Sequence, residues 1–196
     1  MKAETVARGR RAVFLDRDGT LIEEVGYLDR LDRVTLYPWS IDAVRLLRQA
    51  GFAVVVVTNQ AGVARGYFEE SFVHTVHRDL AARFAAGNAP IDGWYYCPHH
   101  RDGVVERYRI ACDCRKPKAG MVRQAADDLS IDLARSIVVG DRWLDVQMGQ
   151  AVGATGLLVR TGFGASEETR PVASVQAAAV TANLMEAVSW ILRHDP

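Results

Sequence analysis

The sequence is short of several features that would each point to a particular class of protein. It carries no net charge, because 24 lysines and arginines balance 24 aspartates and glutamates. A neutral chain has no overall field that would draw it onto nucleic acid or an anionic membrane. No apolar run approaches the roughly 18 residues that a membrane-spanning helix needs. We therefore expect a cytoplasmic protein with neither a nucleic-acid partner nor a membrane partner.

Cysteine is also scarce, with three in 196 residues. An odd number cannot pair completely, and disulfides are rare in a reducing compartment. The first 11 residues are polar and basic, and the apolar stretch that follows is interrupted by two aspartates, so a signal-peptide core is lacking. We expect a flexible tail over residues 1–11 and a single domain over residues 12–196, long enough for a substantial core.

Short apolar stretches alternate along the chain with longer helical patterns. Strands are predicted at 12–15, 52–58, 93–97, 136–139 and 156–159, and helices at 41–49, 69–86, 120–129, 143–152 and 181–193. Ser40 is suited to cap the first helix and Gly51 to end it. Uninterrupted apolar strands are typical of a parallel sheet that is buried on both faces. This pattern predicts an α/β fold with a doubly wound, mostly parallel sheet.

Polar residues stand where three of these strands end. They are Asp16, Thr58 and Asp141. Ligands of doubly wound sheets bind beyond the carboxyl ends of the strands. These three side chains, although distant in sequence, should therefore meet in one crevice.

Two carboxylates, Asp16 and Asp18, lie one residue apart before Gly19. A period of two places both on one side of an extended chain, and the glycine permits a sharp turn. A carboxylate that attacks phosphorus forms an acyl phosphate, and a divalent cation offsets the repulsion between the two anions. Magnesium prefers oxygen ligands; Asp141 is the best additional one, supported by Asp145 one helical turn further on. An isolated Asp-x-Asp-Gly is more often a plain turn, so the prediction depends on the whole set.

The three cysteines lie close to two histidines in a charged stretch of the chain. Cys97 precedes His99 and His100 closely, and Cys112 and Cys114 follow 12 residues after the second histidine. Three thiolates and one imidazole form a closed tetrahedral set, the pattern of a structural zinc site. His99 gives the more compact bite, and His100 remains an alternative. Free buried cysteines are a second interpretation, whereas a disulfide between Cys112 and Cys114 is geometrically poor.

Four groups of residues, taken together, resemble the motifs of the haloacid dehalogenase superfamily of phosphatases. They are Asp16-x-Asp18-Gly19-Thr20, the strand-end Thr58, Lys116, and Gly140-Asp141-x-x-x-Asp145. The resemblance implies that Asp16 is the nucleophile, and that Asp18 is the general acid and later the base that activates water. It also implies phosphoryl binding by Thr58, Asn59 and Lys116, and magnesium binding by Asp16, the main-chain carbonyl of Asp18, and Asp141. A lysine suits this role because its compact charge offsets the charge that develops in transfer.

Five stretches narrow the resemblance further, namely residues 26–27, 58–66, 93–100, 112–117 and 159–162. They are similar to a zinc-containing branch of that superfamily, whose members act on sugar bisphosphates and on histidinol phosphate. The similar region runs from about residue 12 to residue 162. The implied reaction removes the 7-phosphate of D-glycero-D-manno-heptose 1,7-bisphosphate, on the route to ADP- or GDP-heptose and bacterial surface polysaccharide. Histidinol phosphate is the alternative substrate, but its cationic amine would call for acidic groups rather than an arginine-rich rim. The positions implied for substrate contact are Glu24, Gly26, Tyr27, Gln60, Ala61, Arg115 and Arg142.

Two of these positions depart from what is common in that branch. Ala61 stands in place of a serine, and Arg142 in place of a lysine. Arg142 keeps the charge but changes its geometry, which leaves the preferred anomer open. No insertion large enough for a lid lies between residues 19 and 39 or between 60 and 116. We therefore expect a monomer without a separate cap domain, in which a zinc-stapled loop covers the site.

Overall fold

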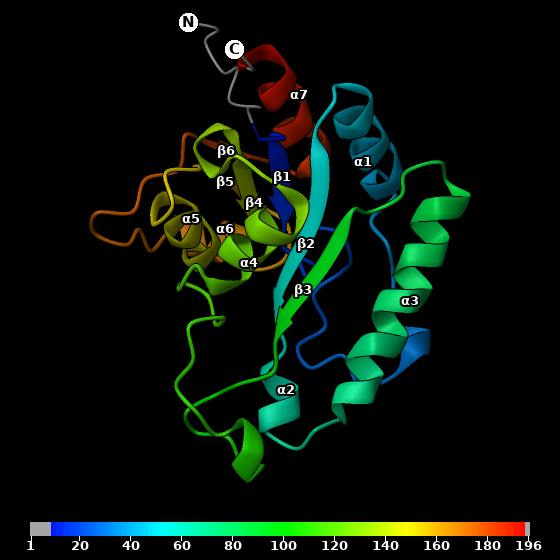
Figure 1. Cartoon of the computed structure of the whole chain (residues 1–196), viewed down its shortest axis with the longest axis vertical. Coiled ribbons are helices and arrows are strands. Elements are labelled where there is room, and N and C mark those ends of the chain that lie inside the picture. The colour runs from blue at the N-terminus through cyan, green and yellow to red at the C-terminus, as the bar shows by residue number, and fades with distance from the viewer. Residues whose placement is uncertain (1–8, 195–196) are drawn as a thin grey trace, which may run out of the picture.

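A six-stranded sheet forms the centre of the molecule, which is seen here in a computed structural model that describes residues 9–194 (Figure 1). Each pair of neighbouring strands is parallel, and their order is β3-β2-β1-β4-β5-β6. This confirms the predicted doubly wound parallel sheet. The strands are β1 (Ala12–Leu15), β2 (Ala53–Asn59), β3 (Gly93–Cys97), β4 (Ile137–Gly140), β5 (Thr155–Val159) and β6 (Ala179–Thr181).

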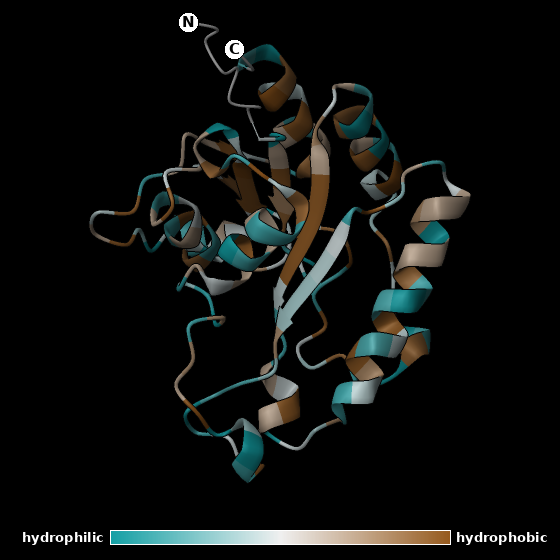
Figure 2. Ribbon diagram, in the orientation of Figure 1, coloured by the Kyte–Doolittle hydropathy of each residue, from teal (hydrophilic) through white to brown (hydrophobic). Residues whose placement is uncertain are grey.

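Helices cover both faces of the sheet, which explains why β1 and most of β2, β4 and β5 are apolar and buried. One face packs against α1 (Ser40–Gln49), α3 (Glu70–Ala86) and α7 (Leu184–His194), and the other against α4 (Gly120–Leu129) and α5 (Trp143–Gln150). Along β2, Val54 and Val56 point into the first core, whereas Val55 and Val57 point into the second. In Figure 2, β2 is brown over most of its length, and the helices around it carry both brown and teal residues.

Short elements complete the fold and were not predicted. They are β6, two brief helices, α2 (Ala61–Ala64) and α6 (Gly164–Glu168), and the 3-10 turns Leu31–Arg33, Glu106–Tyr108 and Leu133–Arg135. The last helix begins at Leu184 rather than at residue 181, because Thr181 still pairs with Val159 of β5. Residues 16–39 and 98–119 otherwise form loops, so the described chain has no separate cap domain.

The predicted C-terminal end of α1 is confirmed, whereas the predicted N-terminal cap is wrong. Gly51 follows the helix with a φ of +85° and ends it as expected. Ser40, however, is already the first helical residue, and its buried hydroxyl donates a 2.7 Å hydrogen bond to the carbonyl of Leu21. That hydroxyl therefore anchors the loop after β1 instead of capping the helix.

The predicted tail lies largely outside the described residues, because residues 1–8 are not among them. The remaining part is joined to the sheet and its surroundings. Arg10 exchanges main-chain hydrogen bonds with Ser130 and Asp132, and the carbonyl of Arg11 accepts one from Ala53. Residues 10 and 11 are thus joined to the rest of the described chain, and the division into a tail and a single domain stays a prediction. Within residues 9–194, no helix is long and apolar enough to cross a membrane.

Candidate active site

A cavity of about 260 Å³ opens at the carboxyl ends of β1, β2 and β4. The chain leaves these strands at Asp16, Asn59 and Asp141, so parallel pairing brings residues distant in sequence to one edge of the sheet. All predicted catalytic, phosphate-binding, substrate-binding and magnesium positions line this cavity. They are Asp16, Asp18, Glu24, Gly26, Tyr27, Thr58, Asn59, Gln60, Ala61, Arg115, Lys116, Asp141, Arg142 and Asp145.

Lys116 lies at the centre of the charged floor. Its Nζ donates hydrogen bonds of 2.6 Å to Oδ1 of Asp16 and 2.6 Å to Oδ1 of Asp145. Burial lowers the pKa of Lys116, but the charges of Asp145 and Asp16 more than offset this effect and the net shift is upward. The lysine is therefore held as a cation against the carboxylate that we expect to be the nucleophile.

Three buried carboxylates share this single lysine. Asp16, Asp141 and Asp145 each offer an oxygen within 4.8 Å of the others. Burial, followed by Asp16 and Asp145, raises the pKa of Asp141 to about 8. For Asp16, burial and the neighbouring carboxylates outweigh Lys116 and raise the pKa to about 7. An all-oxygen donor set with an excess of negative charge fits a hard divalent cation such as Mg²⁺.

The members of this group differ in what else they bind. Both oxygens of Asp145 are taken, because Oδ1 accepts from Lys116 and Oδ2 accepts from the main-chain nitrogen of Arg142 at 3.2 Å. Asp141 accepts from the main-chain nitrogen of Phe163 at 2.8 Å through Oδ2 only. Asp141 therefore keeps one carboxylate oxygen without a hydrogen bond from the described residues, whereas both oxygens of Asp145 are used.

Two glycines form a close cradle around Asp141. Gly19 has a φ of +83° and Gly162 a φ of +55°, and a Cβ on either would come within 2.2 Å of Oδ2 of Asp141. We therefore expect Gly19→Ala to displace the Asp141 carboxylate and to lower turnover by about 10²-fold. Initial rates of phosphate release measure this effect.

Gly51→Ala is the matched control for that substitution. Gly51 has nearly the same φ, +85°, but a Cβ there would meet nothing within 4 Å. Both variants should lose roughly 1 kcal/mol of unfolding free energy from left-handed backbone strain, whereas only Gly19→Ala should lose activity. Equal activity of the two variants would show that contact with Asp141 is unimportant.

The polar residues at the end of β2 form hydrogen bonds with one another, with Asp18 and with the backbone of Lys116. Nε2 of Gln60 donates to Oδ2 of Asp18 and to Oγ1 of Thr58, each at 2.9 Å. Asn59, predicted to bind phosphate, uses its side-chain amide on the backbone of Lys116. Its Oδ1 accepts from the Lys116 nitrogen at 3.1 Å, and its Nδ2 donates to the Lys116 carbonyl at 3.3 Å. Asn59 therefore holds the lysine in place in this structure.

The rim of the cavity carries the charged and aromatic groups expected to meet the rest of the substrate. The guanidinium of Arg142 lies 4.0 Å above the ring of Phe163. Oε1 of Glu24 accepts from the nitrogen of Gly26 at 2.5 Å, and burial, followed by the charge of Asp18, raises the pKa of Glu24. The rim is therefore of mixed charge, with a carboxylate on the loop after β1.

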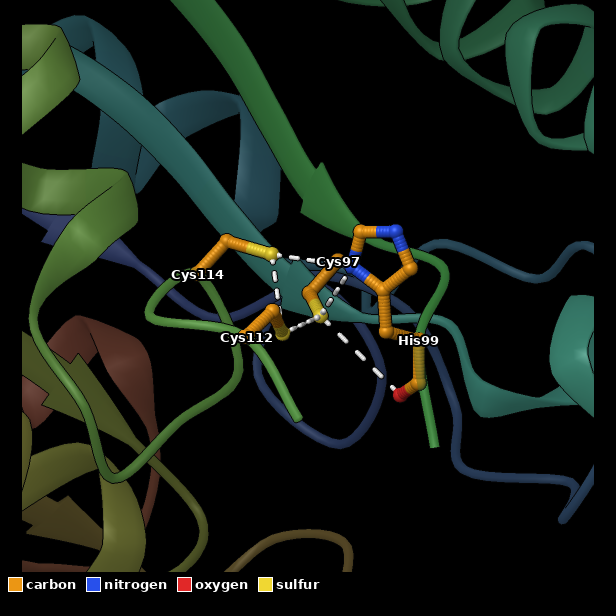
Figure 3. Close-up of side chains that lie close together, drawn as sticks. All are labelled: Cys97, His99, Cys112 and Cys114. Atoms are coloured by element: carbon orange, nitrogen blue, oxygen red, sulfur yellow. Dashed lines mark hydrogen bonds between the residues drawn. The ribbon is translucent and has the colours of Figure 1, made fainter. Parts of the chain in front are cut away.

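The four predicted zinc ligands converge at the end of β3 (Figure 3). Sγ of Cys112 lies 3.5 Å from Sγ of Cys97 and 3.3 Å from Sγ of Cys114. Nδ1 of His99 lies 3.3 Å from Sγ of Cys114 and 3.8 Å from Sγ of Cys97. With ordinary bond lengths, a tetrahedral zinc holds two sulfurs about 3.8 Å apart and a sulfur and a nitrogen about 3.5 Å apart, and the donors of this group lie close to those separations. The donor set therefore fits zinc, and none of the three cysteines forms a disulfide.

His100 lies outside this four-atom group. Its Nδ1 accepts from the main-chain nitrogen of Asp102 at 3.1 Å, and its Nε2 lies 3.3 Å from Nη2 of Arg65. The structure thus brings His99, not His100, to the cysteines. A hydrogen bond connects this group to the cavity: Nη1 of Arg115, which lines the cavity, donates to the carbonyl of His99 at 3.2 Å.

Several lining residues were not predicted from the sequence. Most are apolar or small, and nothing in the local pattern distinguishes them from core residues. Arg17 is different, since its charge inside a buried Asp-x-Asp segment was a signal that could have been read. The additional residues are Arg17, Leu28, Gly62, Phe68, Leu144 and Phe163.

Known proteins resemble this chain over most of its length. A family model described as HAD-hydrolase-like matches residues 113–187, and one described as polynucleotide kinase 3 phosphatase matches residues 11–147. The chain is 46% identical over 158 residues to D-glycero-beta-D-manno-heptose-1,7-bisphosphate 7-phosphatase of Escherichia coli strain K12, which covers 80% of this chain and 83% of that enzyme. The Salmonella typhi enzyme of the same name is 42% identical over 188 residues, covering 95% and 92%.

A solved structure agrees with these relatives. The crystal structure of D,D-heptose 1,7-bisphosphate phosphatase from B. bronchiseptica, complexed with magnesium and phosphate, matches with a TM-score of 0.82 at 30% identity. The match covers 93% of this chain and 98% of that chain. The chain therefore belongs to the haloacid dehalogenase superfamily of hydrolases, and within it to the family of the D-glycero-beta-D-manno-heptose-1,7-bisphosphate 7-phosphatases.

Proposed function

We propose that this phosphatase removes the 7-phosphate of D-glycero-D-manno-heptose 1,7-bisphosphate through an aspartyl-phosphate on Asp16. The observation that carries the proposal is the placement of Asp16 in the cavity, 2.6 Å from the buried ammonium of Lys116 and beside Asp18. Membership of the heptose-bisphosphatase family supplies the substrate.

The reaction takes two steps on the residues of this chain. In the first, an oxygen of Asp16 attacks phosphorus, the bond from phosphorus to the sugar oxygen breaks, and Asp18 gives its proton to that oxygen. In the second, a water oxygen attacks the aspartyl-phosphate, a water proton passes to Asp18, and the bond from phosphorus to Asp16 breaks. Heptose 1-phosphate leaves after the first step and inorganic phosphate after the second, and both aspartates are restored.

Charge around the transferring group explains why Lys116 and Thr58 belong to the site. Lys116 would offset the negative charge of the equatorial phosphoryl oxygens, and the Thr58 hydroxyl would donate to one of them in place of its long contact with Asp18. Mg²⁺ would be held by Asp16, Asp141 and the main-chain carbonyl of Asp18. When bound, it offsets the repulsion between the attacking carboxylate and the phosphate.

The zinc group would act on the structure rather than on the reaction. Cys97, His99, Cys112 and Cys114 would fill all four positions of a tetrahedral zinc, which leaves no open position for substrate. Such a site ties the end of β3 to the segment that leads into Arg115. We therefore propose a structural zinc.

The second phosphate of the substrate would lie at the rim. Arg115 and Arg142 offer guanidinium groups suited to bind phosphate with two parallel hydrogen bonds, and both line the cavity. We propose that the protein acts as a monomer.

Turnover of matched substrates tests this function. Phosphate release should be at least about 10²-fold more efficient, by kcat/KM, from heptose 1,7-bisphosphate than from heptose 7-phosphate, because only the former engages both arginines. The β anomer should be preferred to the α anomer, as the names of the relatives suggest. Faster turnover of histidinol phosphate than of either bisphosphate would refute the proposed substrate.

Arg142→Met tests the binding of the second phosphate. It should raise KM for the bisphosphate and leave KM for heptose 7-phosphate unchanged.

A further inference from the structure

Arg17 is a buried arginine whose ion pair is with one expected catalytic carboxylate. Only 1% of it is exposed, although it lines the cavity. Its Nε donates to Oδ2 of Asp18 at 3.0 Å, and its Nη2 donates to Oδ1 at 3.0 Å. This two-pronged geometry holds a carboxylate in one orientation. Within residues 9–194, Asp18 is the salt-bridge partner of Arg17, and no second one is found.

Burial of the Arg17 guanidinium is unfavourable for the free energy of folding. Its buried Nη1 has no hydrogen-bond partner among the described residues. The neighbouring His77 offers no negative charge, since burial and then the charge of Arg17 lower its pKa to about 3. A buried charge with a single partner contributes little stability, and an apolar side chain of similar size often serves better. Stability therefore does not explain why an arginine occupies this position.

The two oxygens of Asp18 are used unequally. Oδ2 accepts from Nε of Arg17, from Nε2 of Gln60 at 2.9 Å and, at 3.4 Å, from Oγ1 of Thr58. Oδ1 accepts from Nη2 of Arg17 alone among the described residues. One oxygen is thus an anchor, while the other keeps a free lone pair that can carry a proton.

We propose that Arg17 is a positioning residue that fixes the Asp18 carboxylate with Oδ2 anchored and Oδ1 turned to the reacting oxygen. The inference rests on the proposed role of Asp18 as proton donor. Asp18 itself has two side-chain torsions, and Gln60 and Thr58 reach only one of its oxygens. Without the guanidinium the carboxylate can rotate about that anchor, and the proton is no longer held within reach of the leaving group.

Leaving-group dependence provides the test. A sugar alkoxide needs a proton as it leaves, whereas p-nitrophenolate leaves without one. Arg17→Met should therefore lower kcat/KM for the heptose bisphosphate by about 10²-fold, but for p-nitrophenyl phosphate by less than about fivefold. The fall should appear in kcat, with KM nearly unchanged. Arg17→Lys, which keeps the charge but not the fork, should show a smaller loss with the same dependence on leaving group.

A double-substitution cycle separates positioning from damage to the fold. In an Asp18→Asn background, Arg17→Met should cause no further loss, because it acts through Asp18. Equal losses for both substrates, or a full further loss in that background, would overturn the proposal. If Arg17→Met fails to fold, Arg17→Lys carries the same comparison. If the wild type does not hydrolyse the heptose bisphosphate, the comparison is made with another alkyl phosphate that it does hydrolyse. A wrong substrate can then be distinguished from a wrong role for Arg17.

Discussion

Asp16→Asn is expected to abolish turnover while leaving the fold and zinc content of the protein unchanged. Asparagine matches aspartate in shape and keeps one oxygen for Lys116, but its amide cannot form the acyl phosphate. The loss should reach at least about 10⁴-fold in kcat. Phosphate release, circular dichroism and metal analysis measure the three quantities.

Although Asp16→Asn should abolish activity, we expect it not to lower the stability of the protein. Asp16, Asp141 and Asp145 share the charge of one buried lysine. Asp16→Asn removes one like charge from that group, so the magnesium-free variant should be at least as stable as the wild type by urea unfolding. Asp32→Asn is the control, because the Asp32 side chain is 69% exposed and pairs with Arg30 on the surface. Retained turnover in Asp16→Asn would refute Asp16 as the nucleophile.

Loss of the zinc group is expected to destabilise the protein and to lower its activity together. His99→Asn removes one of the four donors, and the segment from Cys112 into Arg115 and Lys116 loses its attachment to the end of β3. We expect a loss of about 3 kcal/mol in unfolding free energy, equivalent to a fall of about 6–12 °C in Tm. Zinc content should fall in parallel, and a chelator should reproduce the effect in the wild type.

His100→Asn is the matched control for this experiment. His100 is the next residue along the chain, but its ring contacts Asp102 and Arg65 instead of the cysteines. Zinc content and Tm should therefore change little in His100→Asn. If both histidine variants bind zinc equally well, His99 is not a ligand and the four-donor site is wrong.

Much of the fold was predictable because its long elements repeat a simple pattern. The bounds of β1, β3 and α4 agree with the prediction at both ends, and α1 ends at Gln49 as predicted. A strand that is buried on both faces must be apolar at each position, which is a signal that the sequence shows directly. β6, α2 and α6 contain only three to five residues each. Such short pieces form because neighbouring elements hold them, so their own residues carry little pattern.

The candidate site was predictable in its residue types more than in its contacts. Asp16, Thr58 and Asp141 were expected to meet because parallel strands end at one edge, and all three line the cavity. Asn59 shows what residue types leave out. The resemblance implies that it binds phosphate, which stays a prediction, and the structure adds that both ends of its amide bond to the backbone of Lys116.

The sequence by itself determined the order of strands and helices, the cluster of carboxylates at strand ends, and the donor types of the metal groups. These features are local, since they follow from side-chain alternation and from spacing along the backbone. Only the tertiary structure decided which groups touch. It placed Lys116 on Asp16, 100 positions away, chose His99 over His100, and turned Arg17 onto Asp18. Such contacts depend on the paths of loops and on how helices pack across the sheet, and no local pattern encodes either.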